Sequence, residues 1–192
     1  MGIFLMGLGL FLGVHSVHML APEWRARTLA SMGEQRWKGL YSLLSLLGLV
    51  GIVWGYSMVR QDPTVLWAPP AGLRHVTLTL MLFSWVLLLA AYVPGNLFKA
   101  KLHHPMLLGV LLWSLAHLAF NGRLVQVLLF GTFGVWAAFS LASCFQRDRL
   151  AGKTYPAGRW LPSLGVLLLA ALVYGLFVAR LHFWLFAVSP LP

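Results

Sequence analysis

The chain has 192 residues, of which 60% are hydrophobic and 9% are charged, and its formal net charge is +10. So few charged residues exclude a water-soluble globular domain, and the mean hydropathy of +0.82 is typical of a polytopic membrane protein. The basic residues lie between apolar segments, where they contact lipid headgroups, so we expect a lipid bilayer as partner and no nucleic acid.

Six apolar segments follow one another along the chain, each about long enough to span a membrane as a helix. Prolines and glycines separate them, most clearly at Pro22, in the loop 60–72 and at Pro94-Gly95-Asn96. The polar segment that follows Pro22 is expected to lie at the membrane surface as a short amphipathic piece. We predict one all-α transmembrane bundle over 1–192, with spans at about 3–20, 37–59, 73–93, 104–121, 124–145 and 161–186.

Six spans place both termini on the same side of the membrane. The loops after the first, third and fifth spans carry ten lysine and arginine residues, whereas the opposite side carries four. Since basic loops stay in the cytoplasm, this bias predicts that both termini lie outside.

The ionisable residues within the spans limit the possible chemistry. All four acidic residues lie in loops, which argues against a proton-coupled transporter and against hydrolysis by paired carboxylates. Cys144 is the single cysteine, so neither an intramolecular disulfide nor a cysteine-based zinc site can form. Histidine remains, and His15 and His117 lie deepest. A hydrogen bond to a neighbouring helix is the ordinary explanation for each of them, and a shared metal centre is the other.

Two imidazoles from different spans suit the iron of a porphyrin, because the macrocycle supplies the other four ligands. A zinc site would need more protein ligands than these spans offer. Trp113 lies one helical turn before His117 and would line such a pocket, and arginine or lysine at either surface would bind the haem propionates. At about 1.5 Å per residue the two histidines are offset by roughly 8 Å along the membrane normal, so His104 and His18 remain alternative ligands.

Five segments of the chain resemble one family of membrane proteins. They are GVHS at 13–16, GEQRWKGLYSLLSLLGL at 33–49, AAYVPGN at 90–96, HHPMLLGVLLWSLAHLAFNG at 103–122 and LLFGTFGVWA at 128–137. Together they resemble the NnrU family of bacterial integral membrane proteins, which are associated with nitrite and nitric-oxide metabolism. This family is similar to the zeta-carotene isomerases of plants and cyanobacteria. In those relatives membrane histidines bind a b-type haem whose redox state gates cis–trans isomerisation of a polyene.

The resemblance implies a haem b protein of the bacterial inner membrane, with His117 and His15 as the axial ligands of the iron. It further implies electron transfer or gas sensing, with respiratory electron carriers or an apolar, polyene-like or quinone-like molecule as partners. Ser114 stands where the isomerases carry a cysteine that has been considered an alternative ligand, and serine is a poor ligand for iron. A redox-gated polyene isomerase is therefore the alternative function, and a haem-free scaffold or transporter is the third.

Overall fold

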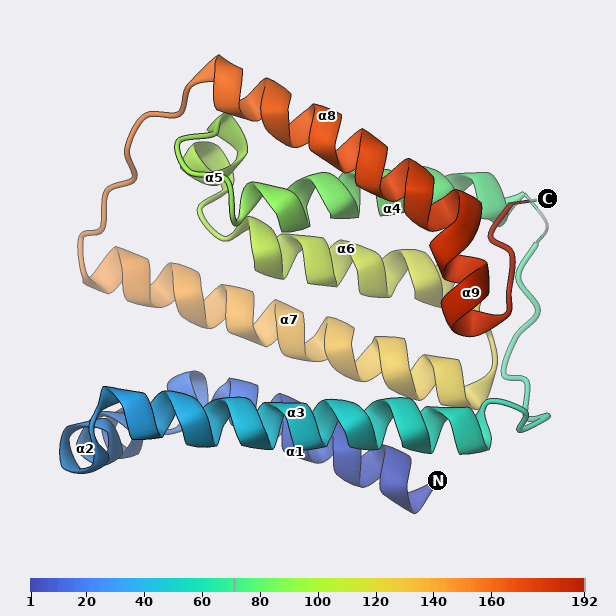
Figure 1. Cartoon of the computed structure of the whole chain (residues 1–192), viewed down its shortest axis with the longest axis horizontal. Helices are drawn as coiled ribbons and strands as arrows, with labels where there is room; N and C mark the ends of the chain where they lie inside the picture. Colours follow the sequence, from blue (N-terminus) through green and yellow to red (C-terminus); the bar gives the residue numbers. More distant parts are fainter. Residues whose placement is uncertain (71, 192) are drawn as a thin grey trace.

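The computed structural model describes residues 1–70 and 72–191, and its long helices run roughly antiparallel to one another (Figure 1). Two short helices, α2 (Pro22–Met32) and α5 (Leu97–Leu102), lie between them at one end of the bundle. The last long helix continues through a π-helical turn, η1 (Phe177–Leu181), into α9 (His182–Phe186). The long helices are α1 (Gly2–Leu20), α3 (Glu34–Val59), α4 (Leu73–Ala90), α6 (Pro105–Phe120), α7 (Leu124–Leu150) and α8 (Trp160–Leu176).

The protein is an all-helical, multi-pass membrane protein. Among the described residues, five helical stretches are long and apolar enough to cross a membrane: α1, α3, α4, α7 and the stretch Trp160–Phe186. Helix α6 has 16 residues and is therefore about 24 Å long, less than a hydrocarbon core of about 30 Å. It lies between α4 and α7, so protein covers much of its surface. The difference between five and six crossings depends on this helix.

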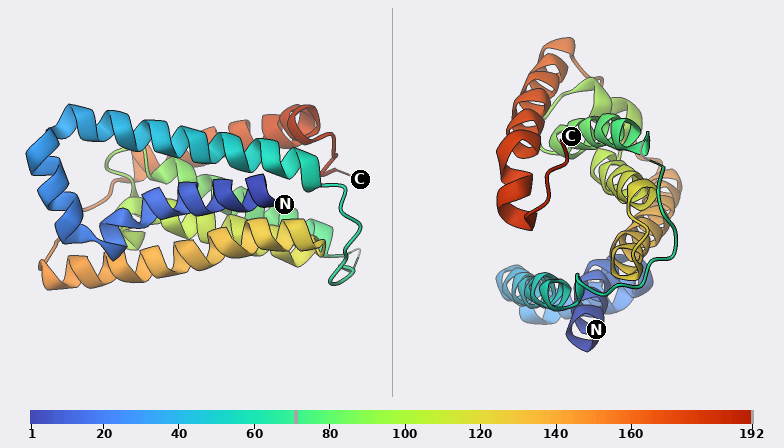
Figure 2. Two further views of the ribbon diagram at one scale, coloured as in Figure 1. Left: turned by 90° about the horizontal axis from the view of Figure 1, so that it is seen from below. Right: turned by 90° about the vertical axis from the view of Figure 1, so that its right-hand side faces the viewer.

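The long helices form an open arc in the order α3, α1, α7, α6, α4 and α8, which is clearest in the end-on view of Figure 2. The open side of the arc lies between α3 and the α8–α9 segment. At one end a guanidinium nitrogen of Arg60, after α3, donates a hydrogen bond across this opening to the carbonyl oxygen of Phe186 at 3.3 Å. Both chain termini lie at that same end of the bundle (Figure 1).

Several helix bounds differ from the predicted ranges. Helix α7 continues to Leu150, beyond the predicted end at 145, because its last turns are polar but hold their own contacts at the membrane surface. Helix α4 ends at Ala90 and not at 93. The predicted breaker at Pro94-Gly95-Asn96 leads into α5, whose first turn is capped by the Asn96 side chain accepting from the Lys99 amide at 2.8 Å. The predicted surface segment after Pro22 forms α2.

Two apolar clusters hold the arc together. One joins α1, α3 and α7 through Phe4, Leu8, Ile52 and Val125, and the other joins α4 to α8. Helices α1 and α3 approach closely, since a Cβ atom on Gly48 would lie 2.7 Å from the backbone nitrogen of Phe11. Such close packing through glycine is common between membrane helices.

Candidate functional site

His15 lies in the last third of α1 and is held by contacts within its own helix. Its Nδ1 lies 2.7 Å from the carbonyl oxygen of Phe11, one turn earlier, and its ring stacks on the Phe11 ring at a centroid distance of 4.3 Å. A carbonyl oxygen can only accept, so Nδ1 carries the hydrogen and the neutral ring has its lone pair on Nε2. Tyr41 of α3 and Trp136 of α7 contact the same ring at 5.4 and 6.1 Å.

His117 has a matching environment near the end of α6. Its Nδ1 donates to the carbonyl oxygen of Trp113, one turn earlier, at 2.9 Å. Its ring stacks on Phe130 of α7 at 4.4 Å, and Phe130 also contacts the Trp113 ring at 4.9 Å. His117 therefore also keeps its Nε2 lone pair available.

The two histidine faces converge on one aromatic side chain of α7. The Phe133 ring lies 5.8 Å from the Phe11 ring and 5.6 Å from the Trp113 ring. Each of these neighbours lies one turn before a histidine and supplies the carbonyl oxygen that holds it. Phe133 thus lies between the two halves of the candidate site.

Helix periodicity places these groups on the less exposed faces of their helices. The positions opposite them on the same three helices are exposed: Met6 on α1 at 67%, Leu115 on α6 at 52% and Val135 on α7 at 59%. In the arc, α1 and α6 flank α7 (Figure 2). His15, His117 and Phe133 therefore lie on faces that contact neighbouring helices.

The structure also gives the offset between the histidines. His15 contacts α7 at Trp136, and His117 contacts it at Phe130, six residues earlier. Six residues of helix correspond to roughly 9 Å, close to the offset expected from the sequence. Among the described residues the two imidazoles do not contact each other, and Phe133 contacts the aromatic neighbour of each.

Trp113 and Ser114, the two other predicted site residues on α6, lie in different surroundings. Trp113 faces α7 and supplies the carbonyl that orients His117. Ser114 is completely buried, and its Cβ lies 3.2 Å from the position of a Cβ atom on Gly134. It therefore lies in the contact between α6 and α7, and among the described residues its hydroxyl has no hydrogen-bond partner.

The alternative ligands His104 and His18 lie towards the end of the bundle that carries α2. His104 donates from Nε2 to the Asp148 carboxylate at 2.8 Å, and the hydroxyl of Tyr155 donates to the same oxygen. Lys153 adds an ion pair to the other carboxylate oxygen at 3.3 Å. His18 lines a cavity between α1, α2 and α3. Neither His104 nor His18 contacts the aromatic residues around Phe133, as His15 and His117 do.

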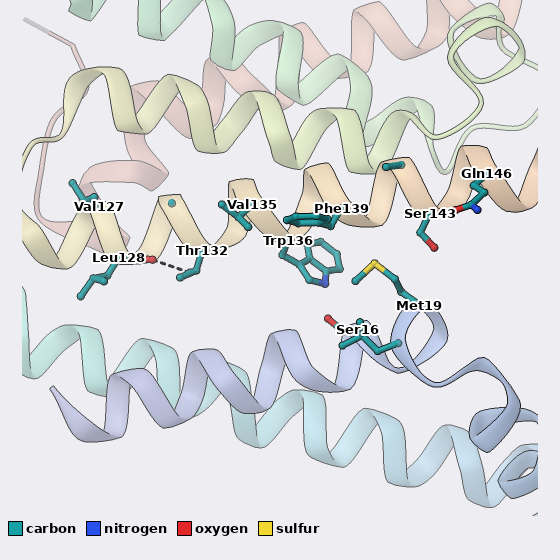
Figure 3. Close-up of a pocket in the computed structure, with 13 residues that line it drawn as sticks. Ser16, Met19, Val127, Leu128, Thr132, Val135, Trp136, Phe139, Ser143 and Gln146 are labelled. Carbon is teal, nitrogen blue, oxygen red and sulfur yellow. Dashed lines mark hydrogen bonds between the residues drawn. The ribbon is translucent and has the colours of Figure 1, made fainter.

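A groove runs along the outer side of α7 beside α1 (Figure 3). It measures about 910 Å³ and extends from Val127 to Gln146, roughly 28 Å of helix. Apolar side chains form most of its surface, and Ser16 of α1 with Thr132 and Ser143 of α7 supply hydroxyl groups. Trp136 both lines the groove and contacts His15, so it separates the groove from the candidate site.

The sequence analysis did not identify the aromatic residues that α7 contributes. Phe130, Phe133 and Trp136 recur every three residues, which places them on adjacent positions of one helix surface. This spacing was the available signal. It carries little weight alone, because such stripes also form ordinary packing surfaces.

The donor set suits a porphyrin iron better than a bare metal ion. Within residues 1–70 and 72–191, no three histidine, cysteine or acidic side chains gather as a protein metal site requires. Two neutral imidazoles with free Nε2 atoms are sufficient for haem. A hydrogen bond from the second ring nitrogen to a backbone carbonyl is also the usual arrangement for a metal-binding histidine.

Comparison with known proteins gives one match. The sequence model of the family described as NnrU protein matches residues 3–190, nearly the whole chain. No curated protein sequence and no solved structure matches the chain.

Proposed function

The chain belongs to the NnrU family, and we propose that it is a haem b protein of the bacterial inner membrane, with His15 and His117 as axial ligands. The observation that carries this proposal is the matched setting of the two histidines. Each donates its Nδ1 hydrogen to the carbonyl oxygen of an aromatic residue one turn earlier, and each keeps Nε2 available. The Nε2 of His104, by contrast, donates a hydrogen bond to Asp148.

The residues around the site have separate roles in this proposal. The carbonyl oxygens of Phe11 and Trp113 fix the tautomer of each imidazole and strengthen its basicity. Phe130, Phe133 and Trp136 exclude water and favour the less charged state of the site. When bound, haem would supply one-electron redox chemistry. We infer a role in electron transfer to or from respiratory carriers of nitrite and nitric-oxide metabolism.

The first test is spectroscopic. Protein purified in detergent after expression with added haem should show a Soret band. His117→Ala should abolish this band and His15→Ala should weaken or shift it, because each variant loses one nitrogen ligand. His103→Ala is the control, since His103 lies before the start of α6, at the opposite end of this helix from His117. A full spectrum in both ligand variants, or a colourless wild-type protein, contradicts the proposal.

The oxidation states separate electron transfer from gas sensing. A six-coordinate, low-spin spectrum in both states, unchanged by nitric oxide, supports electron transfer. A new spectrum when nitric oxide is added to the reduced protein supports sensing, because one histidine must then have left the iron.

The groove beside α7 favours a second candidate function, isomerisation of a polyene. Its length of roughly 28 Å and its apolar lining suit an extended hydrocarbon, and Trp136, which separates the groove from the candidate site, contacts His15 directly. Val135→Trp should fill the groove and reduce both polyene binding and any isomerisation measured by chromatography, with an unchanged Soret band. Val53→Trp, on the exposed side of α3, is the matched control. Equal polyene binding by both variants contradicts a role for the groove.

A further inference from the structure

A cavity of about 640 Å³ lies at the end of the bundle where α2 joins α1 to α3. Arg25 of α2 and Lys38 of α3 line it, together with the aromatic side chains of Trp37 and Tyr41. His18 of α1 also lines it. The cavity therefore combines cationic groups with aromatic walls at the edge of the membrane-spanning region.

The cavity has more positive than negative charge. Glu34 also lines the cavity and pairs with Lys38 at 2.7 Å, but both side chains are more than half exposed, so the pair is weak. The half-buried Arg25 guanidinium lies over the Trp37 ring, 5.9 Å from its centroid, and among the described residues no carboxylate lies within ion-pair distance of it. Arg147 adds a further cation nearby, where it donates to the His18 carbonyl at 3.3 Å. The complementary ligand is an anion with oxygen acceptors, a carboxylate or a phosphate.

The cavity is one helical turn away from the proposed iron ligand. His18 follows His15 by three residues on α1, and Tyr41, which lines the cavity, contacts the His15 ring at 5.4 Å. A haem held by His15 carries two propionate carboxylates that must lie close to it.

We propose that Arg25 binds a propionate of the haem, with Lys38 as the second cation of this site. The inference rests on the proposed function, because it names the residues that anchor the carboxylate side of the same cofactor. The phosphate of an anionic lipid offers the same chemistry and is distinguished by the experiment.

The experiment combines a protein variant with a modified cofactor. Full-length wild-type protein, Arg25→Gln and Arg27→Gln are reconstituted with haem b and with its dimethyl ester, in which both carboxylates are blocked. Arg27 lies on the same helix, is exposed and does not line the cavity, which makes it a matched control. The wild-type protein and Arg27→Gln should bind haem b about tenfold more tightly than the ester, as expected for a charge-assisted hydrogen bond.

Arg25→Gln should lose most of this preference for the acid, with Lys38 retaining the remainder, and its Soret maximum should be unchanged because both histidines remain. Arg25→Lys should recover part of the preference for the acid, which also shows that the site tolerates substitution. This cycle isolates the interaction between Arg25 and the carboxylate from any general loss of stability.

Three results would overturn the inference, and they differ in what else they affect. A wild-type protein that binds neither porphyrin removes the proposed function and this inference together. If Arg25→Gln binds haem and keeps the full preference for the acid over the ester, this inference is overturned and the proposed function is not affected. The same measurements are made in nanodiscs of phosphatidylcholine and in nanodiscs of phosphatidylglycerol, which is anionic. If the preference for the acid is lost in phosphatidylglycerol, the lipid competes for Arg25. That result assigns Arg25 to the lipid phosphate.

Discussion

Asp148 is the residue on which most polar side-chain contacts converge outside the candidate site. Its carboxylate accepts from His104 and Tyr155 and pairs with Lys153, and so it ties the start of α6 to the end of α7 and to the loop 151–159. The ring of His103 stacks on Tyr155 at 4.0 Å, and His103 has a backbone φ of 63°, a strained value for a residue with a side chain. The strain is tolerated because this contact network holds the turn.

Tyr155→Phe should lower the stability of this end of the bundle by about 1.5–3 kcal/mol, the usual contribution of a hydrogen bond to a charged group. Burial, and then the hydrogen bond to the Asp148 carboxylate, raise the pKa of Tyr155 above its ordinary value of about 10. The folded protein therefore holds this proton more tightly than the unfolded chain does. The stabilisation is complete below about pH 10 and is lost as the pH rises through the raised pKa of Tyr155 in the folded protein.

The measurement is the apparent Tm in detergent at about pH 8 and about pH 11. The wild-type protein should lose more stability between these values than Tyr155→Phe does. Tyr92→Phe is the control, because Tyr92 is 74% exposed. Equal pH dependence in the wild-type protein and Tyr155→Phe would show that this hydroxyl does not contribute.

At this scale the sequence predicts that His15 and His117 form the site, and this stays a prediction, whereas it gave no indication of the residues that surround them. His15 and His117 were recognisable because an ionisable group in an apolar segment is unusual. The position of Phe133 between them depends on how α1 and α6 pack against α7, and no local pattern encodes that. The pairing of His104 with Asp148 joins residues 44 positions apart and was likewise not predictable.

The packing of α1 on α3 is the element-scale feature with the most direct consequence for the site. Gly48 faces α1, and a Cβ atom there would lie 2.9 Å from the Cβ atom of Phe11. Phe11 in turn supplies the carbonyl oxygen that holds His15. Small residues at this contact therefore determine where His15 lies.

Gly48→Ala should destabilise the protein by about 1–3 kcal/mol, because the backbone of α1 must move to accommodate the methyl group. Gly39→Ala on the same helix should be neutral or stabilising by up to about 1 kcal/mol, since nothing lies within 4 Å of its Cβ position. Thermal unfolding followed by circular dichroism compares the two variants. Similar Tm values would contradict the close approach of α1 to α3.

Most helices were predictable from apolar length and from proline and glycine breaks, whereas the irregular elements were not. The π-helical turn η1 interrupts a segment that the sequence predicts to be one continuous span at 161–186. Its place depends on contacts across the bundle, such as that of Phe177 with Trp85 of α4 at 5.4 Å. Composition cannot reveal such a change in helix geometry.

For the whole molecule, backbone contacts assign the loops to the two ends of the arc. The Leu66 amide donates to the Gly122 carbonyl at 2.7 Å, so the loop after α3 and the turn after α6 share one end. The Arg159 amide donates to the Gly95 carbonyl at 2.8 Å, so the loops after α4 and α7 share the other. The second end, with α2, carries the ten basic residues counted from the sequence, so the excess of basic residues in cytoplasmic loops predicts that this end faces the cytoplasm.

The number of crossings follows from the side on which two loops lie. Helices α4, α6 and α7 lie between the exposed residues Thr64 and Thr154 in the chain. If all three helices cross the membrane, Thr64 and Thr154 lie on opposite sides of it. If only α4 and α7 cross, both residues lie on the same side. In a Cys144→Ser background, an impermeant thiol reagent should label Thr64→Cys in intact cells and Thr154→Cys only after permeabilisation. The reverse pattern would invert the bundle. Labelling of both in intact cells would mean that α6, despite its place between α4 and α7, does not cross the bilayer.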